Sequence, residues 1–550
     1  MKNKARRIVA LLCALVSVFS LVSFTACKDD GPKIDHTKTQ LHICNFNGGV
    51  GSQWLDEAVI RFTERYKDHS FEPGKTGVQV WIEKSISISV DSFPTSDNDI
   101  YFMEQGNYYN MLSTGNLLDI TDMVTKPMTE FGETASVEDK LYDNYKDYFK
   151  TPAGTYFGIP HYKGIYGITY DRNLWNEKGL FFSADGNVGK KESDTNLSYG
   201  PDGKTGVIDG VDYSYDDGLP ATYAQFDKLC SAILKRGITP IAWSGAYQWY
   251  AEGVLAALKA DFEGKYAHLP YSYNGTTYDK LIKSINADGT VTYEEPTEIG
   301  PENGWKMYAS AGNYYPLKFI ETIINKNYYA TDSFNSATLH TDIQGTYLLS
   351  KYTDKRIAML MEGYWWPYEA SSYVQRMQSS YGESLDSRNF AIMPYPKATE
   401  AQIGEKQTVL DTACSISCIN AHIEPSKIEL AKLFLQFLET DEELLNFLKC
   451  TNITRSFKYD VPEKVYSELN TFAKSVVSVI MNGDHVTPAS KEEIYYNNKS
   501  TFDQFKWFRT SQYSVCTTAM KDKGISAKQI FDAIKGSYTQ DSWNLLITFN

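Results

Sequence analysis

The chain has 550 residues, which suits two to four domain-sized units better than one small module. Charged residues make up 22% and hydrophobic residues 42%, ordinary values for a packed globular protein. The formal net charge is −14, and loss of residues 1–26, which carry four basic side chains and no acid, makes it −18. Such a surface repels phosphate backbones, so nucleic-acid binding by charge alone is disfavoured.

The first 27 residues have the pattern of a processed export signal. A basic start at residues 2–7 is followed by a 17-residue apolar run and then by Thr25-Ala26-Cys27. This order predicts a signal peptide over residues 1–26. The alternative is a permanent membrane anchor, but the run is slightly short for a spanning helix, which needs about 20 residues.

Cys27 follows Thr-Ala in a pattern that resembles a bacterial lipobox, although Phe24 stands where Leu is usual. We therefore expect lipidation of Cys27, a tether over residues 27–37, and attachment to the outer face of the bacterial cell membrane. Of the six later cysteines, none has a CxxC or Cys/His spacing typical of zinc. We expect most of them to be buried small hydrophobes, and disulfide formation stays open.

Strands and helices alternate after the tether. A strand is expected over residues 41–46, a glycine-rich turn over 47–51, and a helix over 54–66, where apolar residues recur at helical spacing. Further strands are expected at 78–89 and 99–102. Later helices should begin at the capping boxes of Thr222, Ser426, Thr440 and Ser526. This order predicts an α/β fold.

Two stretches, residues 181–218 and 264–304, look like insertions. The first contains Asp185-Gly186-Asn187 and Asp202-Gly203-Lys204, whose clustered oxygens are of the kind that calcium prefers. Neither has the full twelve-residue calcium loop, and plain turns are the better interpretation. We therefore expect no cofactor, with a structural calcium ion as the alternative.

Several short motifs follow one another in a fixed order. They span about residues 40–460. The motifs lie at 54–66, 99–102 with 115–120, 158–160 with 167–175, 220–226, 237–241, 356–359 with 363–365, 391–396 and 426–449. In this order they resemble family 1 of the extracellular solute-binding proteins of bacterial ABC importers, the carbohydrate-binding group that includes maltose-binding proteins. Asp171 and Arg172 stand where this family more often has Asn and Lys.

The resemblance implies a two-lobed periplasmic-binding-protein-like fold of type II. Lobe 1 would comprise 38–160 plus 412–455, and lobe 2 would comprise 161–410 plus 456–550. Crossover strands would join the lobes, which close around a ligand by a hinge movement. The implied function is capture of a sugar or oligosaccharide in the cleft and delivery to the membrane permease of an ABC transporter, by a monomer without enzymatic activity.

A sugar offers a hydroxyl rim to polar side chains and a flat C–H face to aromatic rings. The segments that the resemblance brings to the cleft supply both kinds of side chain. In this family the Trp of Gly-x-Trp stacks on sugar, and Trp365 holds that position. The predicted ligand-binding residues are Asn47, Trp54, Glu104, Gln105, Tyr162, Trp243, Tyr247, Trp249, Glu362, Trp365, Trp366 and Arg455. Core packing is the alternative for Trp54 and Trp366, and a structural ion pair is the alternative for Arg455.

An enzyme is the main alternative from another class. A surface-anchored glycoside hydrolase needs two carboxyl groups about 5–10 Å apart, and Glu104 and Glu362 are the candidates. No HExxH, G-x-S-x-G, P-loop or dinucleotide motif is present, so we expect a binding protein. A further alternative is a surface adhesin. Within the class of binding proteins, the alternative is a non-sugar ligand such as a peptide, a polyamine or a metal.

Overall fold

The computed structural model describes most of the chain after the predicted tether. The described residues are 33–104, 108–209, 211–412, 415–488, 490–498, 502 and 506–548. The predicted signal peptide, Cys27, Gln105 and Cys414 lie outside them. Within the described part, no helix combines the length and the apolar character needed to cross a bilayer. The five described cysteines form no disulfide.

The first sheet has five strands in the order β2-β1-β3-β18-β4. Strand β1 (Thr39–Phe46) is parallel to β2 (Val78–Ser85) and to β3 (Ile100–Met103). Strand β18 (Ile416–Ile419) runs antiparallel to both β3 and β4 (Ile159–Pro160). A strand from late in the sequence therefore completes the sheet that the N-terminal strands begin.

Helices cover this sheet because their apolar residues fall on one face. Helix α2 (Gln53–Arg65), expected over 54–66, is confirmed within one residue at each end. It packs against α16 (Ile428–Leu438) and α17 (Asp441–Thr451). Arg61 donates two hydrogen bonds, of 2.6 and 2.7 Å, to the carboxylate of Glu443 and so ties α2 to α17.

The second sheet has four strands in the order β10-β15-β5-β16. Strand β10 (Thr239–Trp243) is parallel to β15 (Ile357–Gly363), whereas β5 (Tyr166–Asp171) is antiparallel to β15 and to β16 (Phe390–Met393). Every residue of β5, β15 and β16 is buried. Continuous burial of this kind marks strands that are covered on both faces.

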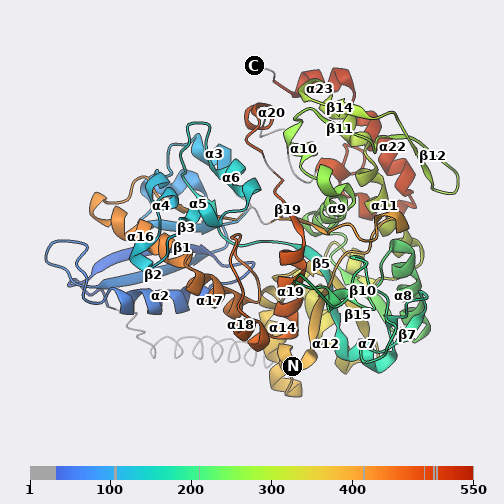
Figure 1. Ribbon diagram of the computed structural model, residues 1–550, viewed down its shortest axis with the longest axis horizontal. Coiled ribbons are helices and arrows are strands. Elements are labelled where there is room, and N and C mark those ends of the chain that lie inside the picture. Colours follow the sequence, from blue (N-terminus) through green and yellow to red (C-terminus); the bar gives the residue numbers. More distant parts are fainter. Residues whose placement is uncertain are drawn as a thin grey trace, which may run out of the picture.

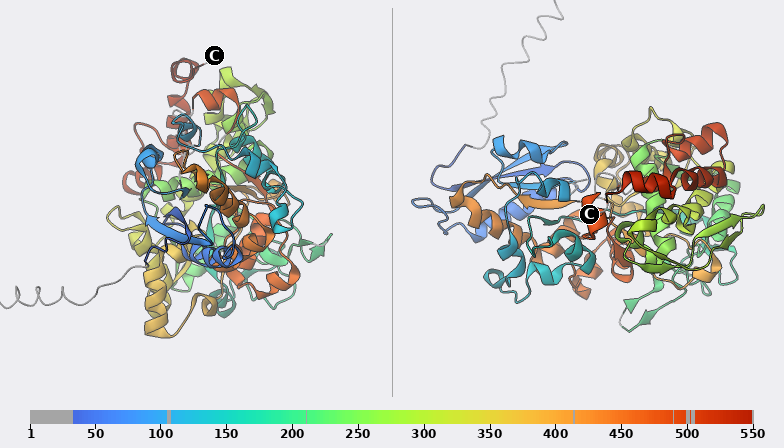
Figure 2. Two further views of the ribbon diagram at one scale, coloured as in Figure 1. Left: turned by 90° about the vertical axis from the view of Figure 1, so that its left-hand side faces the viewer. Right: turned by 90° about the horizontal axis from the view of Figure 1, so that it is seen from above.

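The two sheets lie in separate halves of the molecule (Figures 1 and 2). Helices α8 (Tyr223–Lys235) and α12 (His340–Leu349) contact β10 of the second sheet, and α19 (Thr471–Asn482) contacts β16. Helix α9 (Gln248–Glu263) is buried along nearly its whole length and packs against β5, β15 and α11 (Ala311–Asn325). This half therefore has a deeper core than the first.

Three chain segments run side by side between the halves. The N–H of His161 donates to the carbonyl of Ser415 (3.2 Å), and the N–H of Thr412 donates to that of Gly164 (2.7 Å). Tyr162 forms an antiparallel bridge with Arg455. The described chain thus passes between the sheets at about 161–165, at 410–412 with 415, and at 454–457, while the lobe boundaries stay a prediction.

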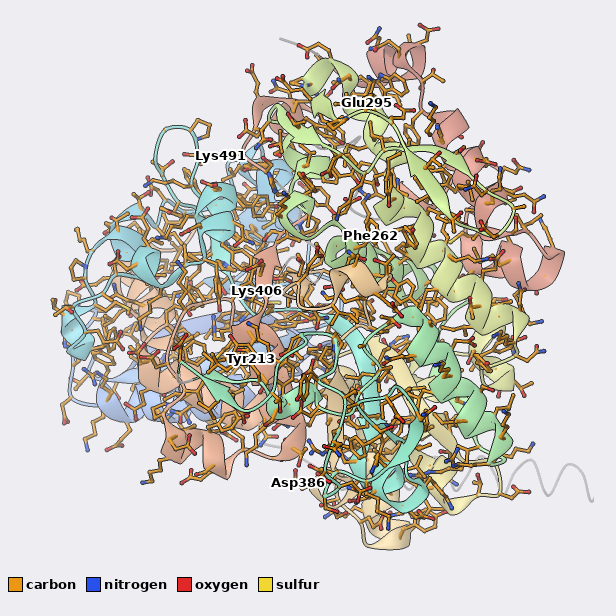
Figure 3. All side chains as sticks on the ribbon, turned by 45° about the vertical axis from the view of Figure 1, so that its right-hand side comes forward. Tyr213, Phe262, Glu295, Asp386, Lys406 and Lys491 are labelled. Carbon is orange, nitrogen blue, oxygen red and sulfur yellow. The ribbon has the colours of Figure 1, made fainter. Side chains whose placement is uncertain are left out.

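The two predicted insertions form small antiparallel strand pairs. The pairs are β6 (Phe181–Phe182) with β7 (Val188–Lys190), β8 (Val207–Ile208) with β9 (Val211–Asp212), β11 (Thr276–Tyr278) with β14 (Thr297–Ile299), and β12 (Ile282–Ile285) with β13 (Val291–Tyr293). Glu295, on the second insertion, lies at the opposite end of this half from Asp386 (Figure 3). Each of the four pairs is a separate two-stranded sheet, and none joins the four-stranded second sheet.

The carboxylates expected as alternative calcium ligands lie in turns. Asp185 accepts from the N–H of Asn187 (3.4 Å), and Asp202 accepts from the N–H of Lys204 (2.8 Å). Such local bonds to the backbone two residues on are typical of Asx turns. Among the described residues, no three acidic, His or Cys side chains are arranged to hold a metal ion.

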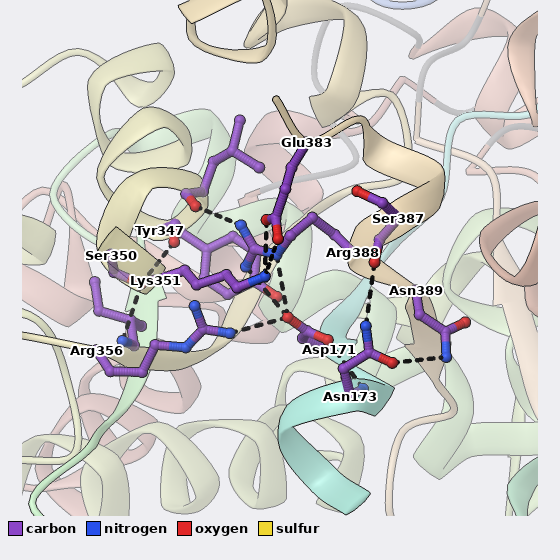
Figure 4. A network of polar contacts seen from close by, with 12 residues as sticks. Asp171, Asn173, Tyr347, Ser350, Lys351, Arg356, Glu383, Ser387, Arg388 and Asn389 are labelled. Atoms are coloured by element: carbon purple, nitrogen blue, oxygen red, sulfur yellow. Dashed lines mark hydrogen bonds and ion pairs between the residues drawn. The ribbon is translucent and has the colours of Figure 1, made fainter. Parts of the chain in front are cut away.

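Asp171, at the end of β5, organises a buried polar network (Figure 4). One carboxylate oxygen accepts from the N–H of Asn173 (3.0 Å), where it caps the helix that follows. The other accepts from Arg356 (2.9 Å) and Arg388 (3.2 Å). Two guanidinium groups thus offset the cost of burying the carboxylate, which explains why an acid can replace the usual Asn here.

Candidate functional site

A cavity of about 530 Å³ lies between the two halves. Its lining residues are Phe46, Asn47, Gly48, Gly49, Gly51, Glu104, Tyr166, Tyr247, Trp249, Tyr250, His340, Thr341, Trp365, Tyr368, Glu369 and Ser371. They come mainly from the loops that follow β1, β3, β10 and β15. Open α/β sheets bind ligands at these carboxyl ends, and the volume lies in the range of about 300–1,000 Å³ usual for ligand pockets.

The first wall is a glycine-rich loop packed against Glu104. Gly49 has a φ of +51°, and a Cβ atom at this position would collide with the Glu104 carboxylate and the Tyr162 hydroxyl. Only glycine fits both the conformation and the space. The hydroxyl of Tyr162 donates to Glu104, and the indole N–H of Trp54 donates to the carbonyl of Gly51 (3.1 Å). These bonds hold the loop and the carboxyl group in place.

The second wall is aromatic. The ring of Tyr166 packs edge-to-face on Trp365 (5.2 Å, 76°) and on Tyr250 (6.0 Å, 88°), an arrangement that aromatic pairs prefer. Tyr247 and Trp249, at the start of α9, are 46% and 42% exposed. The inner rings fix one another, and the outer two are partly exposed to the cavity that they line.

Glu369 lies in the same wall and is held by several donors. The hydroxyl of Tyr250 lies 3.0 Å from both carboxylate oxygens, and the Nε2 of Gln344 donates at 2.7 Å. The Nε2 of His340 lies 3.7 Å away. Burial raises the pKa of the Glu369 carboxyl, although the charge of His340 and these hydrogen bonds oppose that rise.

Two further carboxyl groups have raised pKa values near the cavity. Burial raises the pKa of Glu104 to about 8; the Tyr162 hydrogen bond opposes this rise, whereas the charges of Glu369 and Asp411 add to it. Burial, with the nearby charge of Glu369, also raises the pKa of Glu362. Burial therefore favours the protonated form of these three carboxyl groups more than that of an exposed glutamate.

Five of the predicted binding residues line the cavity. They are Asn47, Glu104, Tyr247, Trp249 and Trp365. They come from both halves, so the structure brings the predicted polar rim and the predicted aromatic loop to one place. Gln105 lies outside the described residues.

Three of the predicted tryptophans lie in the core and not in the cavity lining. Trp54 packs against Phe102 at 5.1 Å, and Trp243 is fully buried. The indole N–H of Trp366 donates to the hydroxyl of Thr169 (3.1 Å). None of the three lines the cavity, and core packing, the alternative given for Trp54 and Trp366, describes both of these side chains here. Their contact with a ligand stays a prediction.

The other three predicted residues lie behind the lining. Arg455 forms a buried ion pair with Glu439 (2.6 Å), so the alternative of a structural ion pair applies. Tyr162 supports Glu104 from behind the cavity wall. Glu362 is buried and accepts from the N–H of Gly363 (3.0 Å). None of the three is among the lining residues, and their contact with a ligand stays a prediction.

Sequence reasoning missed several lining residues. Tyr166, His340, Thr341, Tyr368, Glu369 and Ser371 were not predicted to line the cleft. Glu369 could have been found, because it follows Trp365 by four residues, one turn of a helix. His340 offers no local signal, since only the fold brings the start of α12 beside the aromatic loop.

The fold is shared with solved structures of solute-binding proteins. A chitin oligosaccharide binding protein is similar with a TM-score of 0.55 at 15% identity, over 92% of this chain and 99% of that chain. The solute receptor AcbH is similar with a TM-score of 0.54 at 11% identity (92% and 100%). RafE in complex with raffinose is similar with a TM-score of 0.53 at 12% identity (91% and 99%).

No protein-family model and no curated protein matches the chain. At such low identity the structural likeness shows the fold alone. It confirms the prediction of a two-lobed α/β fold of the solute-binding-protein type.

Proposed function

We propose that the chain is an extracellular solute-binding protein of family 1 that captures a sugar or oligosaccharide and delivers it to an ABC permease. The observation that carries the proposal is the pairing of two walls across one cavity: aromatic rings from the second half face polar groups from the first. Three proteins of similar structure support the proposal, since they bind chitin oligosaccharide, raffinose and β-D-galactopyranose.

The two walls offer complementary contacts to a pyranose ring. Tyr247, Trp249 and Trp365 present ring surface to the C–H face. Glu104 and Asn47 present acceptors and a donor to the hydroxyl rim. A ligand that contacts both walls binds the closed arrangement of the lobes better than an open one, and such differential binding is what drives hinge closure.

Export and anchoring complete the proposal. The basic start, the apolar run and Thr25-Ala26-Cys27 support cleavage of the signal peptide and lipidation of Cys27. The chain would then act as a lipid-anchored monomer on the outer face of the bacterial membrane, beside the permease. Growth of the source cells with a labelled fatty acid tests this: label should enter the wild-type chain and not the Cys27→Ala variant.

A surface glycoside hydrolase remains the second candidate, because a pKa of about 8 at Glu104 would suit a general acid. A hydrolase also needs a second carboxyl group that is ionised and acts as base or nucleophile. Among the described lining residues the only other carboxyl is Glu369, and burial raises its pKa as well. The site thus lacks the contrast between two carboxyls that this chemistry requires, and binding without turnover fits better.

A thermal-shift screen of the chain from Lys28 onward against a glycan panel tests the proposed function. A bound sugar should raise Tm, because a ligand selective for the folded state stabilises it, and should be recovered intact. Tyr247→Ala should weaken binding at least tenfold. Tyr381→Ala is the matched control, because Tyr381 is equally exposed (46%) and lies outside the cavity lining. No shift with any glycan, or cleaved sugar, would contradict the proposal.

A further inference from the structure

The charged groups of the cavity lining are mainly acidic. Glu104 and Glu369 line it from opposite halves, and no Lys or Arg is among its described lining residues. Glu362 lies close enough behind the wall for the charge of Glu369 to raise its pKa. Three carboxyl groups therefore lie in or beside the cavity, and His340 is the one basic side chain among its described lining residues.

The hydrogen bonds of these carboxyl groups come almost entirely from neutral donors. Tyr162 serves Glu104, and Tyr250 and Gln344 serve Glu369. One oxygen of Glu362 is buried and has no hydrogen-bond partner. Among the described residues, His340 is the one basic side chain at ion-pair distance from any of the three carboxyls, with its Nε2 3.7 Å from an oxygen of Glu369.

Several buried acids elsewhere are paired with a basic side chain, although Asp216, in the first insertion, is fully buried without one. Asp171 is paired with Arg356 and Arg388, and Glu439 is paired with Arg455. Buried carboxylates are normally compensated in this way. The carboxyls at the cavity lack an equivalent partner, so the compensating cation is expected from the ligand.

Aromatic rings close the same space. Tyr166, Tyr247, Tyr250, Trp249 and Trp365 all line the cavity. Their π faces attract a cation, most strongly where water is excluded, and they also accept the C–H face of a sugar ring. Rings and carboxyl groups together suit a ligand that is both ring-shaped and positively charged.

We propose that the cleft selects sugars that carry a protonated amine over their neutral and anionic analogues, with Glu104 and Glu369 as partners of the ammonium group. The inference rests on the proposed function and narrows its ligand class. An ammonium group favours the ionised form of Glu104, whose pKa burial raises to about 8, so binding should release protons to the solvent. A uronate would instead bring a further negative charge beside them without compensation.

Isothermal titration of the chain from Lys28 onward tests this inference with three trisaccharides: a fully deacetylated glucosamine trimer, its N-acetylated counterpart and trigalacturonate. At pH 6.5 and equal ionic strength, the amino sugar should bind at least tenfold more tightly than the N-acetylated one, and trigalacturonate should not bind. Titration in two buffers of different ionisation enthalpy should show proton release for the amino sugar alone.

Variants separate the role of charge from that of shape. Glu369→Gln and Glu104→Gln should each lower the affinity for the amino sugar at least tenfold more than the affinity for the N-acetylated sugar, because both variants lose hydroxyl contacts and only amino-sugar binding also loses the charge. Glu295→Gln removes the same charge at an exposed position on the second insertion and should change neither affinity. Thermal melts check that each variant is folded. Gln has nearly the shape of Glu, so the hydrogen bonds from the neutral donors Tyr162, Tyr250 and Gln344 can still form.

The outcomes distinguish this inference from the proposed function. Equal affinity for the amino and N-acetylated sugars, or preference for trigalacturonate, overturns the inference and leaves sugar capture standing. Tighter binding of spermidine than of any amino sugar also overturns it, since the ligand would then need charge without a ring. Absence of binding by every glycan, the neutral panel included, overturns both.

Discussion

Replacement of Gly49 by Ala should damage the ligand site through its packing against Glu104. Gly49 has a φ of +51°, which costs a residue with a Cβ atom about 1–2 kcal/mol. The new methyl group would also overlap the Glu104 carboxylate and the Tyr162 hydroxyl, and such overpacking adds about 1–3 kcal/mol. The expected loss in free energy of unfolding is therefore about 2–5 kcal/mol.

Gly115→Ala is the matched control, because Gly115 has a φ of +71° but no heavy atom within 4 Å of the added Cβ. It should lose only the conformational part, about 1–2 kcal/mol. Denaturant unfolding of both variants measures the difference. Titration with the sugar found in the screen should show at least a tenfold loss of affinity, about 1.4 kcal/mol, for Gly49→Ala alone. Equal losses of stability with unchanged binding would refute the close packing of this loop on Glu104.

Three further predictions concern the site and its support. Trp365→Ala should abolish detectable sugar binding and lower the free energy of unfolding by about 3–5 kcal/mol, because the indole is only 8% exposed and packs on Tyr166. Calorimetric titration measures the affinity and denaturant unfolding measures the stability. An unchanged affinity would remove Trp365 from the site. Because burial raises the pKa of Glu104 to about 8, the folded chain keeps a proton that the unfolded chain loses near pH 4.5. The free energy of unfolding should therefore fall between about pH 4.5 and 8, by at most about 1.4 kcal/mol per pH unit from this group; melts of Glu104→Gln should lack that part of the slope, and identical slopes would contradict the shift. Arg455→Met should lower the free energy of unfolding by about 3–5 kcal/mol, because it leaves the carboxyl of Glu439 buried and unpaired; recovery of stability in a double variant with Glu439→Leu checks the cause, and no recovery would contradict it.

The fold could be predicted from local patterns because each pattern reflects burial on one face. The apolar spacing after Trp54 predicts α2 to within one residue at each end. The capping boxes at Thr222, Thr440 and Ser526 mark real helix starts, since in each the hydroxyl accepts from the backbone three residues on. At Ser426 a short 3-10 turn precedes the helix, so the predicted box is not formed there.

The site could be predicted only in part, because residue type does not reveal which side of a loop faces the cavity. Trp243 and Trp249 belong to one aromatic stretch, yet one is fully buried and the other is 42% exposed. Trp365 and Trp366 are neighbours, and only the first lines the cavity. Partners such as His340 come from distant segments, so only the packed fold brings them to the site.

The most direct test of the account is native mass spectrometry of the chain from Lys28 onward after incubation with the glycan panel, followed by analysis of the released ligand. The account predicts one sugar bound per chain, with a mass identical to that of the sugar supplied, and loss of the complex in Trp365→Ala. A chain that binds no member of the panel, or that returns shortened glycans, would contradict it.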